Sequence, residues 1–121
     1  MQYTYARACS VLRKANLTLD ELKTTPVVLD EQILTDTAYR LIKQLALFTE
    51  RVEQAMDKLE PSIVSRYLVE LAQQFNRFYH DNMILVEDEV IKHARLVIVT
   101  STIQTIKTGL SLIGLSAPEQ I

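Results

Sequence analysis

The sequence predicts an all-α domain, a bundle of about five helices, and three observations support this. The 121 residues include two glycines and three prolines, fewer than a turn-rich β fold would need. Apolar residues recur at spacings of three and four along most of the chain, as on one face of an α-helix. Capping and stop residues separate these runs. We therefore expect a single domain over residues 1–121, large enough to bury its own core.

The first predicted helix covers residues 2–15. Its apolar side holds Tyr5, Ala8, Cys9 and Leu12. The angular spacing of helical residues places an exposed stripe on the opposite side: Tyr3, Arg7, Ser10 and Lys14. Residues 16–30 read as a connector with one weak helical turn, which a capping pattern begins and Pro26 ends.

Two further helices are expected before Pro61. Residues 31–47 keep one face apolar, through Leu34, Ala38, Leu41, Ile42 and Leu45. Thr49 is expected to cap the helix that follows, which ends at residues 60–61. Pro61 suits the first position of the next helix, where its missing N–H costs nothing. That helix runs to about residue 79 and is the clearest amphipathic helix in the chain.

The last helix is expected to begin at residues 87–89, after a turn over residues 80–86, because the helix dipole favours three acids there. Residues 96–103 are rich in β-branched side chains and could also form a strand. A helix is favoured because apolar spacings of three and four continue to Ile113, and no glycine or proline interrupts residues 87–108. Such a helix, apolar on two sides, is usually central in a bundle. Gly114 would stop it, and residues 115–121 read as non-helical.

Composition argues for a cytoplasmic protein with no membrane partner. No apolar run approaches the roughly 20 residues of a membrane span. The first 14 residues contain no apolar block of the kind found in signal peptides. The single cysteine, Cys9, cannot form an internal disulfide, which fits a reducing compartment.

No residue pattern suggests catalysis, metal binding or a cofactor site. The sequence has no glycine-rich phosphate loop and no CxxC pair. His80 and His93 have no second metal ligand at helical spacing, and Cys9 reads as an inert core thiol. We therefore expect function through a binding surface.

The charge is unevenly distributed, although the net charge is −2. Residues 1–19 carry Arg7, Arg13 and Lys14 and no acid, whereas residues 20–60 hold nine acids against five bases. An anionic partner would therefore meet the first helix before the rest of the molecule.

Three segments together resemble one family. They are QYTYARACS at 2–10; LEP at 59–61 with RYL at 66–68, LA at 71–72 and FNRFYH at 75–80; and ARL at 94–96 with KTGLSLIGL at 107–115 and APE at 117–119. In order and spacing they look like the C-terminal anticodon-binding (DALR) domain of arginyl-tRNA synthetase. Two departures are Met1, at what would be an internal position, and Ile121, where the family commonly ends in a methionine that packs into the anticodon loop.

This resemblance implies a class I ligase that uses ATP to attach arginine to its tRNA. The HIGH and KMSKS motifs of the catalytic domain do not occur, so the chain is expected to be an excised C-terminal part. ATP would belong to the absent catalytic domain, and this domain would need no cofactor. Its expected partners are the anticodon stem-loop of the arginine tRNA and the catalytic domain of the same chain. We expect a monomer.

The predicted tRNA-binding residues are Tyr3, Arg7, Lys14, Arg66, Asn76, Tyr79, His80, Asn82, Arg95 and Ile121. The aromatic and Arg side chains would meet unstacked loop bases, as is usual for RNA loops. Each has a competing interpretation. Arg7 could pair with an acidic helix, Tyr79 could belong to the core with Phe75 and Phe78, and Arg66 and Arg95 could satisfy nearby acids.

Two other functions fit the same sequence. The two-sided apolar last helix could pair with another chain, which would make this a protein–protein interaction module. The chain could also be the DALR domain of a different synthetase.

Overall fold

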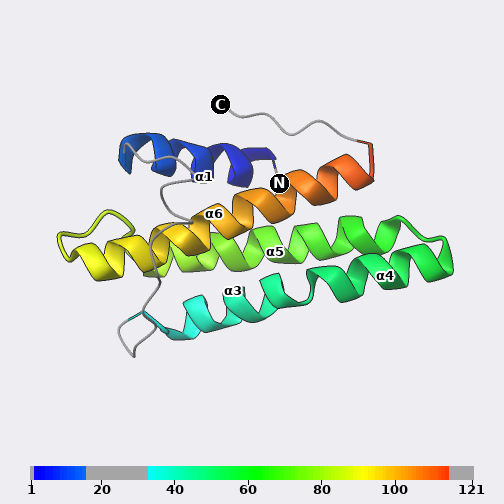
Figure 1. Ribbon diagram of the computed structural model, residues 1–121, viewed down its shortest axis with the longest axis horizontal. Helices are drawn as coiled ribbons and strands as arrows, with labels where there is room; N and C mark the ends of the chain where they lie inside the picture. The colour runs from blue at the N-terminus through cyan, green and yellow to red at the C-terminus, as the bar shows by residue number, and fades with distance from the viewer. Residues whose placement is uncertain (1, 16–32, 115–121) are drawn as a thin grey trace.

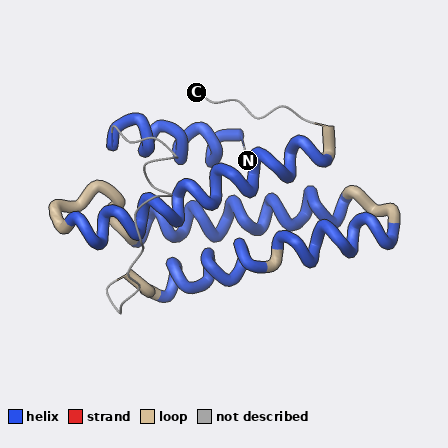
Figure 2. The backbone as a smooth tube through the Cα atoms, viewed as in Figure 1, coloured by secondary structure: helices blue, strands red, loops and turns tan. Residues whose placement is uncertain are grey.

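The computed structural model describes residues 2–15 and 33–114, with the side chains of residues 2, 3 and 15 left out. Within these residues the chain forms five helices and no strand (Figures 1 and 2). They are α1 (Gln2–Ala15), α3 (Asp36–Ala46), α4 (Phe48–Lys58), α5 (Ser62–Asp81) and α6 (Glu89–Leu112). The predicted all-α bundle is therefore confirmed. None of the helices described is long and apolar enough to cross a membrane.

Two long helices, α5 and α6, lie side by side through the centre of the molecule (Figure 1). Helices α3 and α4 follow each other along one side of α5, and α1 packs on the opposite side, mainly against α6. The first helix and the α3–α4 segment, which holds four acids and four bases, therefore lie on opposite sides of the bundle.

The ambiguous β-branched segment is helical, and α6 is buried on both of its apolar sides. Val99 and Ile106 are 0% exposed, and Leu96 and Ile103 are also buried. Gly109 allows close contact with α5, because an added Cβ would lie 2.7 Å from Cδ2 of Leu68. Helices α1, α3 and α5 all pack on α6, which confirms its expected central place.

Side-chain caps begin helices α3 and α6, whereas α4 and α5 begin without one. The hydroxyl of Thr35 accepts a 3.3 Å bond from the Ala38 N–H at the start of α3. A carboxylate oxygen of Asp88 accepts bonds of 2.9 and 3.2 Å at the start of α6. Gly114 follows α6 with φ of 80°, the left-handed conformation expected of a helix stop.

The prediction that Thr49 caps α4 is wrong. Helix α4 begins at Phe48, and Leu47 is both the last cap of α3 and the first cap of α4. Leu47 keeps helical torsion angles (φ −82°, ψ −5°), whereas a side-chain cap needs an extended residue. The predicted start of α3 was also early, since Leu34 precedes the helix and is exposed. The connector at 16–30 and the tail at 115–121 lie outside the described residues.

Candidate nucleic-acid interface

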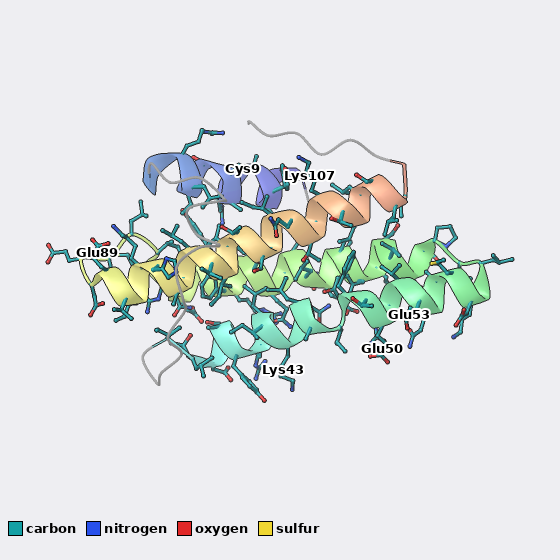
Figure 3. All side chains as sticks on the ribbon, viewed as in Figure 1. Cys9, Lys43, Glu50, Glu53, Glu89 and Lys107 are labelled. Carbon is teal, nitrogen blue, oxygen red and sulfur yellow. The ribbon has the colours of Figure 1, made fainter. Side chains whose placement is uncertain are left out.

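Helix α1 carries basic side chains and no acid. Arg13 and Lys14 lie exposed in its last turn, where a helix dipole favours positive charge. Arg7 and Ser10 are half-buried, so the predicted stripe is less exposed than its helical spacing suggested. Thr4, Ala6 and Val11 join Tyr5 and Ala8 in the buried side of the helix. Cys9 is partly buried and packs against the core (Figure 3).

Arg7 and Tyr79 meet where α1 crosses the carboxyl end of α5. The Arg7 guanidinium carbon lies 4.8 Å from the centroid of the Tyr79 ring, within the range of a cation–π contact. The other neighbour of Tyr79 is Phe75, with ring centroids 6.1 Å apart. Tyr79 is half-buried, whereas Phe75 and Phe78 are 0% exposed. Tyr79 therefore ends an aromatic row that begins in the core and reaches a basic side chain at the surface.

A groove of about 540 Å³ opens beside this pair. It is lined by Val11 and Lys14 of α1, by Tyr79, His80 and Asp81 of α5, and by residues 82–85 of the following turn. The volume lies within the range of sites that hold small ligands. Four predicted residues that are far apart in sequence, Arg7, Lys14, Tyr79 and His80, are thus brought to one place.

Asn82 is held inside the protein. It is 3% exposed, and its side-chain nitrogen donates 2.9 Å bonds to the Thr37 hydroxyl and the Phe78 carbonyl. Its side-chain oxygen accepts a 3.0 Å bond from the Thr35 hydroxyl. A buried amide with these partners joins the end of α5 to the start of α3. These bonds support a positioning role for Asn82, and its predicted contact with RNA stays a prediction.

Asn76 and Arg95 also make internal contacts. The Thr4 hydroxyl donates to Oδ1 of Asn76 over 3.3 Å, which links α1 to α5. One terminal nitrogen of the Arg95 guanidinium donates to the Met83 carbonyl, and its Nε is buried. Arg95 thus ties the α5–α6 turn to α6. The sequence had suggested nearby acids as the internal partners of Arg95. The partner in the structure is a backbone carbonyl instead.

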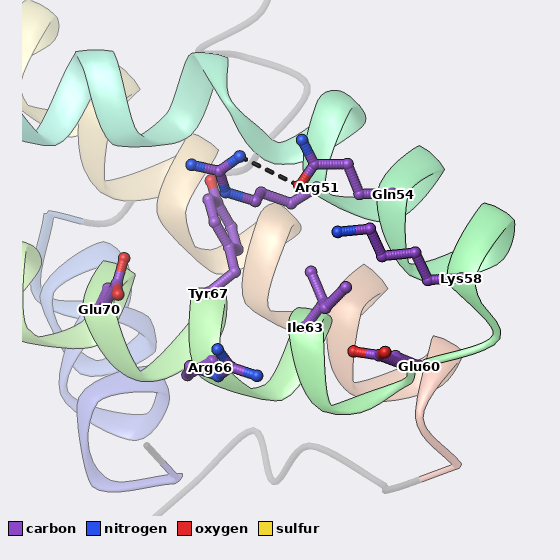
Figure 4. A pocket seen from close by; sticks show the side chains of 8 residues that line it. All are labelled: Arg51, Gln54, Lys58, Glu60, Ile63, Arg66, Tyr67 and Glu70. Atoms are coloured by element: carbon purple, nitrogen blue, oxygen red, sulfur yellow. Dashed lines mark hydrogen bonds between the residues drawn. The ribbon is translucent and has the colours of Figure 1, made fainter.

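Arg66 lies elsewhere, in a separate pocket between α4 and α5 (Figure 4). It stands about 20 Å along the helix from Tyr79, given a rise of 1.5 Å per residue. The pocket is lined by Arg51, Gln54, Lys58, Glu60, Ile63, Arg66, Tyr67 and Glu70. Two carboxylates stand among its three cations, whereas the groove beside Tyr79 is lined by one lysine, Lys14, and one carboxylate, Asp81. The structure does not group it with the other candidates.

Tyr67, in the same pocket, is a buried tyrosine with an internal hydrogen-bond partner, unlike the half-buried Tyr79. Its ring is 2% exposed, and its hydroxyl donates to the Gln44 carbonyl. Burial raises the pKa of Tyr67, and the positive charge of Arg51 offsets this only in part. The side chain therefore stays neutral and joins α5 to α3.

Two apolar groove residues and one cation were not predicted. Met83 and Leu85 are 73% and 41% exposed, and Arg13 is exposed beside Lys14. No sequence signal marked residues 83–85, because a short apolar run in a turn looks like part of the core. Tyr3 and Ile121 lie outside the described side chains. In the described part of the chain no three metal-binding side chains cluster together.

The family model for the DALR anticodon binding domain matches residues 1–121. The chain belongs to this family. Among curated relatives, the arginine–tRNA ligase of Alkaliphilus metalliredigens is 46% identical over 121 residues, and that of Halothermothrix orenii is 42% identical over 122 residues. Both matches cover all of this chain and 20% of the relative, so the chain spans about a fifth of their length.

Solved structures agree with this assignment. The arginyl-tRNA synthetase of Thermus thermophilus superposes with a TM-score of 0.82 at 31% identity, over 99% of this chain and 20% of the other. A chain from Campylobacter jejuni gives a TM-score of 0.80 at 23% identity, over 99% of this chain and 25% of its own, and supports the fold alone. The helices and their order are thus those of known DALR domains.

Proposed function

We propose that this domain binds the anticodon stem-loop of the tRNA for arginine, as part of an arginine–tRNA ligase. The observation that carries the proposal is the Arg7 guanidinium over the half-buried Tyr79 ring, beside a groove lined by Lys14 and His80. Unstacked bases in RNA loops stack on aromatic rings and Arg planes. Basic side chains contact the phosphates between those bases. The names of the relatives supply the amino acid.

In this proposal the chemistry takes place in another part of a longer chain. Residues 1–121 would be the anticodon-binding domain, and a catalytic domain of the same protein would use ATP to join arginine to the tRNA. Binding of the distant anticodon would select the correct tRNA. We place the activity in the cytoplasm, where such a ligase would serve protein synthesis, and we expect the domain to be monomeric.

The alternative function, a protein–protein interaction module, was suggested by an apolar second side of α6 that could pair with another chain. The second apolar side of α6 is covered by helices of the same chain within the described residues. A DALR domain of another synthetase is disfavoured by relatives that carry the name arginine–tRNA ligase.

The proposal is tested by titrating the 121-residue chain with a stem-loop RNA that carries an arginine anticodon. A second RNA differs only at the middle anticodon base. We expect weaker binding of the second RNA by at least tenfold at moderate salt, because a mismatched base leaves polar groups unpaired. Equal affinity for both RNAs would contradict anticodon reading, and no affinity for either would contradict RNA binding altogether.

A further inference from the structure

The turn between α5 and α6 alternates buried and exposed side chains. Asn82 and Ile84 are 3% and 5% exposed, whereas Met83 and Leu85 are 73% and 41% exposed. The two buried residues anchor the turn, and the two exposed residues project apolar groups outward. Exposure of a large apolar side chain at a fixed position is more informative than exposure on a loose loop.

Hydrogen bonds fix the turn from both sides. On the α5 side, Asn82 bonds to Thr35, Thr37 and the Phe78 carbonyl. On the α6 side, Arg95 donates to the carbonyl of Met83 itself. The backbone of Met83 is therefore held by Asn82 on one side and by Arg95 on the other, and this fixes the point from which its side chain projects.

That place is the groove already described. Met83 and Leu85 line it together with Lys14, Tyr79 and His80. The groove thus combines apolar and aromatic surface with one cation, Lys14, and one carboxylate, Asp81, next to a helix that carries three basic residues and no acid. A nucleotide offers the matching pair of features, since its base has an apolar face and its phosphate is negative.

The other exposed internal methionine provides a contrast. Met56 is 69% exposed, but it lies in a groove whose lining contains no charged residue. That groove is lined by Val52, Ala55, Met56, Leu59, Pro61, Val64, Leu112 and Ile113. Met56 has similar exposure without the charge that a phosphate-bearing ligand would need.

We infer that Met83, with Leu85 beside it, is the apolar contact for one unstacked base of the bound RNA loop. Asn82 and Arg95 are positioning residues that hold the turn in place for this contact. The polarizable thioether of methionine packs well against flat aromatic surfaces. The inference rests on the proposed function, and it names a subsite on the turn side of the groove, opposite α1.

The chain contains three methionines, Met1, Met56 and Met83, so their methyl groups can be followed individually by NMR after ¹³C-methyl labelling. The probe is the stem-loop RNA with an arginine anticodon, and Met83→Leu and Met56→Leu assign the signals. We expect the Met83 methyl signal to move upfield on RNA addition, because it would lie over a base ring. The Met56 signal should stay in place.

Affinity gives the second readout. Met83→Ala should weaken RNA binding roughly fivefold, Met83→Leu should retain most of the affinity, and Met56→Ala should bind like the unchanged chain. An unmoved Met83 signal, or equal effects of the two alanine variants, would overturn the inference. If Lys14→Glu weakens binding while Met83→Ala does not, the subsite is wrong and the proposed function stands. If the unchanged chain binds no RNA, both are wrong.

Discussion

The two ends of α5 each hold a tyrosine, an arginine and a pocket, yet they differ in how these groups are used. At the amino end, Tyr67 is buried and its hydroxyl bonds to the α3 backbone, while Arg66 shares its pocket with Glu60 and Glu70. At the carboxyl end, Tyr79 is half-exposed beneath Arg7. The same residue types therefore serve internal packing at one end and form the proposed binding surface at the other.

Charge on the flanking helices separates the two ends further. Helix α1, at the carboxyl end, carries three bases and no acid, whereas α4, at the amino end, carries Glu50, Glu53 and Asp57 together with Arg51 and Lys58 (Figure 3 labels the first two). An RNA phosphate would be attracted more strongly to the first surface than to the second, where acids and bases are mixed. Arginine content alone would not distinguish them.

The largest expected effect is on stability and concerns Asn82, whose hydrogen bonds hold the turn at the carboxyl end of α5. Asn82→Ala should lower the free energy of unfolding by roughly 2–3 kcal/mol, because three side-chain hydrogen bonds are lost from a buried site. Urea unfolding followed by circular dichroism measures this. Asn76→Ala is the matched control, since the side chain of Asn76 accepts one long bond of 3.3 Å from Thr4, and its loss should cost less than about 1 kcal/mol. If Asn82→Ala lowers the free energy of unfolding no more than the control does, Asn82 does not hold the turn in place.

Charge reversal tests the difference in potential between the two ends. Lys14→Glu should weaken RNA binding about tenfold at low salt and reduce the slope of affinity against salt, since one phosphate contact is lost and one repulsion gained. Lys58→Glu, in the amino-end pocket, makes the same chemical change and should alter affinity less than about twofold. Filter binding at several salt concentrations gives both quantities. Similar slopes for the two variants would mean that RNA does not distinguish the ends.

Tyr67→Phe tests the internal role of the amino-end tyrosine. At neutral pH the variant should be less stable by about 1 kcal/mol, because the hydrogen bond to Gln44 is lost. Burial raises the folded-state pKa of Tyr67 above the unfolded value near 10, so its contribution is complete below pH 10 and declines above it. The gap between the two proteins should therefore narrow as pH rises past 10. A gap that is constant with pH would contradict a neutral, buried hydroxyl.

Sequence reasoning predicted the helices well because apolar residues recur at helical spacing along each of them. It correctly placed the start of α6 at residues 87–89 and the stop at Gly114. It missed the near-continuous junction at Leu47, where tertiary packing keeps helical torsion angles in place of a side-chain cap. It could not foresee that Gly109 serves close packing against Leu68, because that contact joins residues far apart in sequence.

The candidate site was predicted unevenly for the same reason. Residue type was enough to suggest Arg7 and Tyr79 as binding residues. Their contact depends on how α1 crosses α5, which the sequence does not show. Asn82 looked like a surface residue because amides are mostly exposed, and the structure instead gives it buried partners. Met83 lay in the predicted turn over residues 80–86 with no role assigned, and only the alternation within that turn shows that it points outward.

The central claim is that RNA binds at the carboxyl end of α5, and two arginine variants test it most directly. Arg7→Ala and Arg66→Ala remove the same side chain from the two ends, and both are titrated with the arginine-anticodon stem-loop at moderate salt. We expect Arg7→Ala to weaken binding about tenfold, through lost stacking and lost phosphate attraction, and Arg66→Ala to change it less than about twofold. A greater loss for Arg66→Ala, or equal losses for the two variants, would contradict the claim.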